Sequence, residues 1–83
     1  MPHYRFNLYN SVGFVPDEQG RELPDVEAAR GEALKAVRGI IADEVLEGRI
    51  DLNGRIEIMD GEGPPILTLP FAEAVVITRG LAK

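Results

Sequence analysis

The sequence predicts an α+β fold, in which one long helix packs across a mostly antiparallel sheet of three or four strands, in the order β-β-α-β-β. Three observations predict it. Residues 3–9 alternate between the two faces of a strand, residues 25–47 carry apolar side chains at helical spacing, and short apolar runs at 55–58 and 66–69 flank a turn rich in glycine and proline. A helix and strands in this order are expected to form two packed layers.

Length and composition limit the function classes. The chain has 83 residues, nine Lys or Arg, fourteen Asp or Glu and no cysteine. This length allows one domain, expected over residues 1–79 with a frayed tail at 80–83. The net charge of −5 argues against nucleic acid as a partner, and the lack of cysteine excludes a disulfide scaffold. Without a membrane-length apolar run or a signal-peptide pattern at the start, we expect no membrane partner and a cytoplasmic location.

The first strand is expected at residues 3–9, where Tyr4, Phe6 and Leu8 share one face. A turn at 10–13 leads to the extended apolar pair Phe14 and Val15. Residues 17–22 then form a polar loop, and its glycine favours a tight turn.

The helix has clear start and stop signals. Pro24 precedes Asp25, whose carboxylate is a good N-cap, and Gly48 is a natural C-terminal stop. A helix over residues 25–47 is the longest element and is expected to cover the sheet.

The second half begins with a hairpin, whose strands are expected at 55–58 and 66–69. Residues 71–78 are ambiguous between helix and strand, because Pro70 favours a helical turn while 75–78 have strand composition. We expect one helical turn through Ala74, followed by an extended segment that adds a strand to its own sheet or to a neighbour's.

No chemical motif is apparent. Ser11 is the only serine and His3 the only histidine, and an extended strand between them would hold them apart. The loop acids do not follow a calcium-loop pattern, and Gly61 and Gly63 precede prolines and a strand rather than a helix. We therefore expect no enzyme, no cofactor and no catalytic, cofactor-binding or metal-binding residue.

Arg30 falls inside the apolar arc of the predicted helix. One hypothesis is a structural ion pair between Arg30 and a carboxylate of the preceding loop, which would fasten the loop to the core; the candidates are Asp17, Glu18 and Glu22. The alternative is that the Arg30 stem covers apolar surface while its guanidinium reaches water.

The opposite helix face carries a stripe of mostly small residues. Two mid-helix glycines cost about 1 kcal/mol each relative to alanine, and a water-facing leucine is also unfavourable. A second copy or another protein docking there would explain the stripe; exposed glycines and a single exposed leucine are also ordinary surface features. This possible partner face consists of Gly31, Lys35, Gly39, Ala42 and Leu46.

Four segments carry a resemblance to a known family: MPHYRF, PDEQGRELPDVEAARGEALKA, DLNGRIEIMD and LTLPFAEAV. Over residues 1–77 the chain resembles a family of short bacterial proteins known only as a domain of unknown function. That resemblance implies stand-alone cytoplasmic proteins with no established activity. A weaker likeness, at the level of the fold, connects the loop and helix entry to HicB-type antitoxin domains.

These observations favour a non-enzymatic protein-interaction or regulatory module, acting as a homodimer or on another protein. The alternatives are a small-ligand-binding domain, which would need a concave pocket, and an antitoxin-like partner of another protein.

Overall fold

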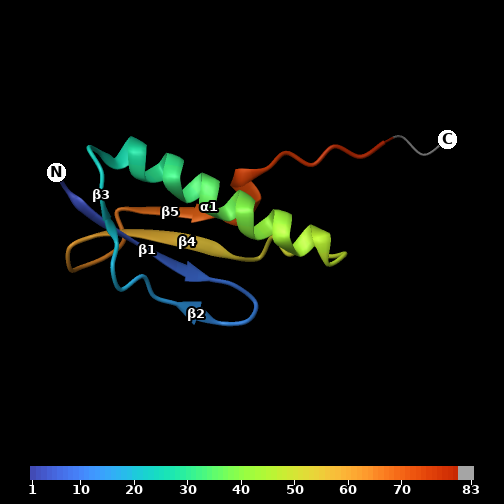
Figure 1. Ribbon diagram of the computed structural model, residues 1–83, viewed down its shortest axis with the longest axis horizontal. Helices are drawn as coiled ribbons and strands as arrows, with labels where there is room; N and C mark the ends of the chain where they lie inside the picture. The colour runs from blue at the N-terminus through green and yellow to red at the C-terminus, as the bar shows by residue number, and fades with distance from the viewer. Residues whose placement is uncertain (81–83) are drawn as a thin grey trace.

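The computed structural model describes residues 1–80, and Figure 1 shows a single long helix lying along one face of a sheet. In chain order the elements are β1 (His3–Tyr9), β2 (Phe14–Val15), β3 (Arg21–Glu22), α1 (Val26–Leu46), β4 (Arg55–Asp60), β5 (Leu67–Pro70) and the 3-10 helix η1 (Phe71–Ala74). The predicted α+β class and the helix-on-sheet packing are confirmed.

The sheet is antiparallel throughout, with strand order β2-β1-β4-β5 and with β3 paired to the start of β1. β1 is central: it pairs with β4 from Tyr4↔Asp60 to Tyr9↔Arg55, while β2 and β3 pair with its two ends. The sheet therefore has five strands in the described part of the chain, against three or four expected.

The additional strand, β3, corrects the prediction that residues 17–22 form only a loop. Arg21 and Glu22 pair with Tyr4 and His3, and both side chains are exposed. A two-residue edge strand with no buried side chain has no apolar alternation, so only the backbone pairing reveals it.

The core lies between α1 and the sheet. Its helix side is built from small and branched residues, and its sheet side from larger apolar ones, with Phe71 of η1 closing one end. Ala29 and Ala33 are fully buried, which lets the first half of α1 lie close to the strands. The buried residues are Tyr4, Ala29, Ala33, Val37, Ile41, Ile56, Ile58, Leu69, Phe71 and Ala74.

The ends of α1 agree with the sequence. The Asp25 carboxylate accepts a hydrogen bond from the Ala28 N–H at 2.9 Å, and Glu47 is the C-cap. Gly48 follows with a φ of 89°, a left-handed conformation that costs glycine little. The helix predicted over residues 25–47 is confirmed, caps included.

The segment after β5 also follows the prediction. η1 supplies the helical turn through Ala74, and Val75 is extended. Residues 75–80 do not pair with the sheet of their own chain. Of the tail predicted at 80–83, residues 81–83 lie outside the described residues.

Candidate functional site

The possible partner face predicted on the helix lies in solvent. Gly31, Lys35, Gly39, Ala42 and Leu46 are all exposed, and a Cβ built on either glycine would meet no atom within 4 Å. The five residues therefore form the outward stripe that the helical spacing indicates, and partner docking on it stays a prediction.

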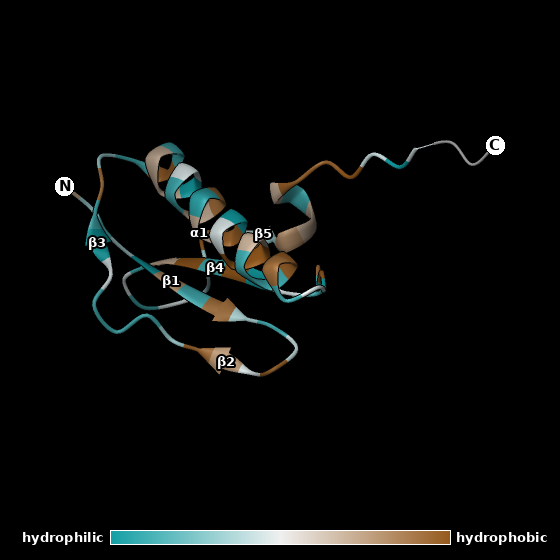
Figure 2. Ribbon diagram, turned by 45° about the vertical axis from the view of Figure 1, so that its right-hand side comes forward, coloured by the Kyte–Doolittle hydropathy of each residue, from teal (hydrophilic) through white to brown (hydrophobic). Residues whose placement is uncertain are grey.

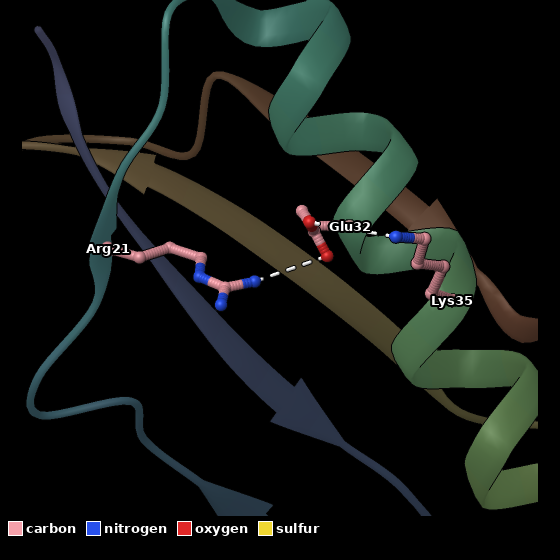
Figure 3. A network of polar contacts seen from close by, with 3 residues as sticks. All are labelled: Arg21, Glu32 and Lys35. Carbon is pink, nitrogen blue, oxygen red and sulfur yellow. Dashed lines mark ion pairs between the residues drawn. The ribbon is translucent and has the colours of Figure 1, made fainter.

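The proposed Arg30 ion pair is not formed. Arg30 is exposed and has no ion-pair partner among residues 1–80, so the arrangement in solvent is the one observed. A different pair joins the loop to the helix, with the charges exchanged: Arg21 of β3 reaches Glu32 of α1 at 3.1 Å (Figure 3). Lys35 approaches the other oxygen of Glu32 at 3.9 Å. Arg30 precedes Glu32 by two residues, about 200° around the helix axis, so its side chain leaves α1 on a different side from the one that faces β3.

Asp17, one of the three suggested partners of Arg30, binds main-chain N–H groups instead. Its carboxylate accepts hydrogen bonds from the N–H groups of Gly20 (2.9 Å), Phe6 (3.0 Å) and Gln19 (3.2 Å). The Asp17 N–H in turn donates to the side chain of Asn7 at 2.9 Å. Asp17 thus fills the gap between β2 and β3 along one edge of β1, whose other edge pairs with β4.

Burial alone would raise the pKa of Asp17, but the backbone N–H groups of Gly20, Phe6 and Gln19, together with the Arg5 charge, outweigh it. The pKa of this carboxyl is therefore held below its usual value. Three main-chain hydrogen bonds use most of the acceptor capacity of this carboxylate, which indicates a structural role.

A small cavity of about 240 Å³ lies between β1, the 17–22 segment and α1. Its polar groups are already engaged, because Arg21 and Glu32 pair with each other and Asp17 binds main-chain N–H groups. The cavity is smaller than the roughly 300–1,000 Å³ typical of ligand pockets. Its lining residues are Phe6, Asp17, Gly20, Arg21, Glu32 and Ala36.

Exposed apolar side chains lie on the last turn of α1, on the segment that follows it and at the tip of the β1–β2 hairpin, and we call this set of residues the apolar end. Leu46 is 86% exposed and Val12, at the tip of the β1–β2 hairpin, is 94% exposed. Figure 2 shows hydrophobic colouring on the last turn of α1 and on that hairpin. The apolar end consists of Val12, Val45, Leu46 and Ile50.

Two hydrogen bonds hold the parts of the apolar end together. The Ser11 hydroxyl donates to the Asp51 carboxylate, which joins the hairpin tip to the segment before β4. The Arg49 N–H donates to the Glu44 carbonyl at 3.1 Å, which ties that segment to α1. The Ser11 bond, the Asn53 N–H and the Arg49 charge lower the pKa of Asp51.

Sequence reasoning found only Leu46 of this surface. Val12 sits within the turn closed by reciprocal Asn10–Gly13 backbone bonds, and Ile50 follows the helix stop, so neither position belongs to a periodic element. Their proximity depends on the Ser11–Asp51 contact across 40 residues of sequence, for which the sequence contains no signal.

A second surface missed by sequence reasoning lies at the end of the β1–β2 hairpin. The rings of Tyr9 and Phe14 stack with centroids 4.6 Å apart, and the Arg55 guanidinium lies 4.0 Å from the Tyr9 centroid. Arg55 also pairs with Glu57 at 3.0 Å. The cation is thereby neutralised within the sheet, and this cluster is satisfied internally.

Residues 1–80 contain no group of three His, Asp or Glu side chains placed to hold a metal ion. Within the same residues, no helix is both long enough and apolar enough to cross a membrane.

Comparison with protein-family models matches residues 3–72 to the family described as Domain of unknown function (DUF6894). The suspected resemblance to a family of unknown function is confirmed, while the likeness to HicB-type antitoxins is not. Searches of curated proteins and of solved structures found no match. Because the family model covers most of the chain, this protein belongs to the family described as Domain of unknown function (DUF6894).

Proposed function

We propose that this protein is a non-enzymatic protein-interaction or regulatory module of the cytoplasm, and that the apolar end is its contact surface. One observation supports the proposal: four apolar side chains are exposed on three segments of the chain that hydrogen bonds join to one another. Burying such side chains against a partner removes apolar area from water, which is the main driving force of protein association.

The fixed geometry of the apolar end supports this function. A surface whose parts are already joined loses little conformational freedom on binding, so more of the contact energy appears as affinity. Leu46 also ends the predicted partner face, so a partner on the apolar end would extend along α1 toward Ala42 and Gly39.

Small-ligand binding is the second candidate, and the cavity beside Arg21 and Glu32 is the observation that favours it. The cavity accommodates only a small molecule, and its charged groups would have to give up existing partners. The interaction function therefore has the stronger support. An antitoxin-like role would be one form of interaction with another protein.

The test is affinity capture from a lysate of the native host with three immobilised baits. These are the wild type, the double variant Leu46→Glu/Ile50→Glu, and the control Ile66→Glu, which changes an exposed apolar residue near the start of β5. We expect a stoichiometric protein on the wild type and control that is lost from the double variant. The same proteins on all three baits would contradict a role for the apolar end.

The cavity has its own test. Arg21→Ala should leave protein capture unchanged under the interaction proposal. If instead a metabolite raises the melting temperature of the wild type and not of Arg21→Ala, ligand binding is the better description.

A further inference from the structure

We propose that the apolar end binds residues 76–79 of a second copy of this chain, so that two copies exchange these segments in a two-fold dimer. This inference rests on the proposed function and names its partner. It is based on two exposed parts of the same chain, residues 76–79 and the apolar end, which have apolar side chains and opposite charges next to them.

The donated segment starts from a fixed point. Arg38 of α1 donates its Nε–H to the Ala74 carbonyl at 2.7 Å, and Ala74 is buried against the core. Beyond the half-buried Val75, the chain leaves the body of the molecule, as Figure 1 shows in red. The anchor sets where the segment begins and the direction in which it leaves.

The segment exposes apolar side chains within its own chain. Val76 is 91% exposed and Ile77 is 61% exposed, and neither belongs to a strand. Two consecutive β-branched residues favour an extended conformation and are usually found packed against a neighbour. Thr78 and Arg79 follow, and Arg79 has no ion-pair partner among residues 1–80. The segment therefore presents an apolar pair followed by a cation.

The receiving surface has the complementary pattern. Its apolar side chains adjoin the C-terminal turn of α1, which contains no basic residue. Asp43 and Glu47 add negative charge where the helix dipole is already negative. Arg49 pairs with Glu47 at 3.6 Å, and Asp43 has no ion-pair partner among residues 1–80. A segment that brings Val76 and Ile77 to Leu46, and Arg79 to these carboxylates, would satisfy both the apolar and the charged parts.

A second copy provides one such segment and has one receiving surface for the segment of the first. In a two-fold dimer each copy donates one segment and receives one, so a single contact type is formed in duplicate. The edges of the sheet are poorer receivers of the segment. β5 ends at Pro70, which has no N–H, and β2 is only two residues long.

The test is sedimentation velocity of the full chain from about 10 to 500 μM, a range suited to a weak, small interface. We expect the wild type to pass from monomer to dimer within it. Ile77→Asp should remove the dimer by changing the segment, and Leu46→Asp should remove it by changing the receiving surface. Ile66→Asp, a matched change of an exposed isoleucine, should dimerise as the wild type does.

Mixing the two defective variants distinguishes exchange from other contacts. Ile77→Asp retains an intact receiving surface and Leu46→Asp retains an intact segment, so their mixture should form a heterodimer through one of the two contacts. Neither variant should associate alone. Circular dichroism melts, with unchanged melting temperatures expected for these exposed positions, establish that both variants are folded.

The charge contact gives an independent readout. Arg79→Glu should raise the dimer dissociation constant at least about tenfold, and combining it with Asp43→Arg and Glu47→Arg should recover part of the loss. A wild type that is monomeric up to 500 μM overturns the second-copy proposal, as does a mixture of Ile77→Asp and Leu46→Asp that associates no more than each variant does alone at the highest concentration.

These results separate the two proposals. If the wild type is monomeric while Leu46→Glu/Ile50→Glu loses a captured protein of another sequence, the apolar end binds that protein and the exchange is refuted. If association persists in Leu46→Asp, dimerisation uses another surface and the exchange is refuted, while the affinity capture still decides whether the apolar end binds another protein.

Discussion

The carboxylate of Asp17 accepts three main-chain hydrogen bonds and occupies the gap between β2 and β3 along β1. One side chain thereby replaces the backbone partners that the edge of β1 lacks there. Asparagine in its place would keep one acceptor oxygen and turn an NH₂ group toward main-chain donors.

We expect Asp17→Asn to lower the free energy of unfolding at pH 7 by about 1.5–3 kcal/mol, the range for hydrogen bonds to a charged group. The pKa of Asp17 is lowered on folding, so its ionised form stabilises the fold above the unfolded value near 3.8. That contribution is lost as the pH falls through the lower folded pKa. Urea unfolding at pH 7 and pH 3 should show a smaller difference from wild type at pH 3. The control Glu18→Gln should change little at either pH.

The ion pair between Arg21 and Glu32 is partly exposed, with about half of the Arg21 side chain in solvent. A double-mutant cycle of Arg21→Ala and Glu32→Ala should give a coupling of only about 0.2–1 kcal/mol.

Arg30→Ala should show no coupling to Glu18→Ala, because Arg30 makes no ion pair within residues 1–80. A coupling free energy above about 1 kcal/mol between Arg30 and Glu18 would support the ion pair that the sequence suggested between Arg30 and the loop.

At the scale of the elements, two glycines have opposite roles. Gly54, just before β4, lies so close to the sheet end that a Cβ there would sit 2.7 Å from the Phe71 ring and 2.8 Å from the Tyr9 carbonyl oxygen. Gly39, on the outer face of α1, has open space where its Cβ would be.

Gly54→Ala should therefore destabilise the protein by about 1–3 kcal/mol through overpacking, while Gly39→Ala should stabilise it by about 0.5–1 kcal/mol through helix propensity. Thermal unfolding of the two variants beside the wild type measures both effects. If both substitutions shift the melting temperature equally and in the same direction, Gly54 is not closely packed against Phe71.

At the scale of the whole molecule, the net charge affects the stability of the fold. The chain carries a net charge of −5, and its ion pairs within residues 1–80 are at least partly exposed and therefore weak. Self-repulsion among the acids therefore opposes folding more than the ion pairs support it.

Raising the NaCl concentration from about 20 to 300 mM shortens the screening length and should raise the melting temperature by about 1–3 °C. The same change should favour dimerisation if apolar contact dominates it, since two acidic copies then repel each other less. A melting temperature that falls with salt would mean that the ion pairs contribute more than the net repulsion costs.

Local patterns in the sequence determined the α+β class, the extent of α1 with both caps, the hairpin of β4 and β5, and the turn η1. Helix caps, alternation and turn residues act between neighbours in the chain, so a short window contains their cause. The same patterns placed Gly31, Lys35, Gly39, Ala42 and Leu46 on the outer face of α1.

Only the tertiary structure decided which residues form the ion pair between β3 and α1, the pairing of β3 with β1, and the contact between the hairpin tip next to Val12 and the segment next to Ile50. Each of these depends on contacts between residues far apart in sequence: Arg21 with Glu32, Tyr4 with Arg21, and Ser11 with Asp51. Such contacts follow from how the helix and strands are positioned when the core packs. Their geometry is a property of the packed molecule and leaves no periodic signal in the chain.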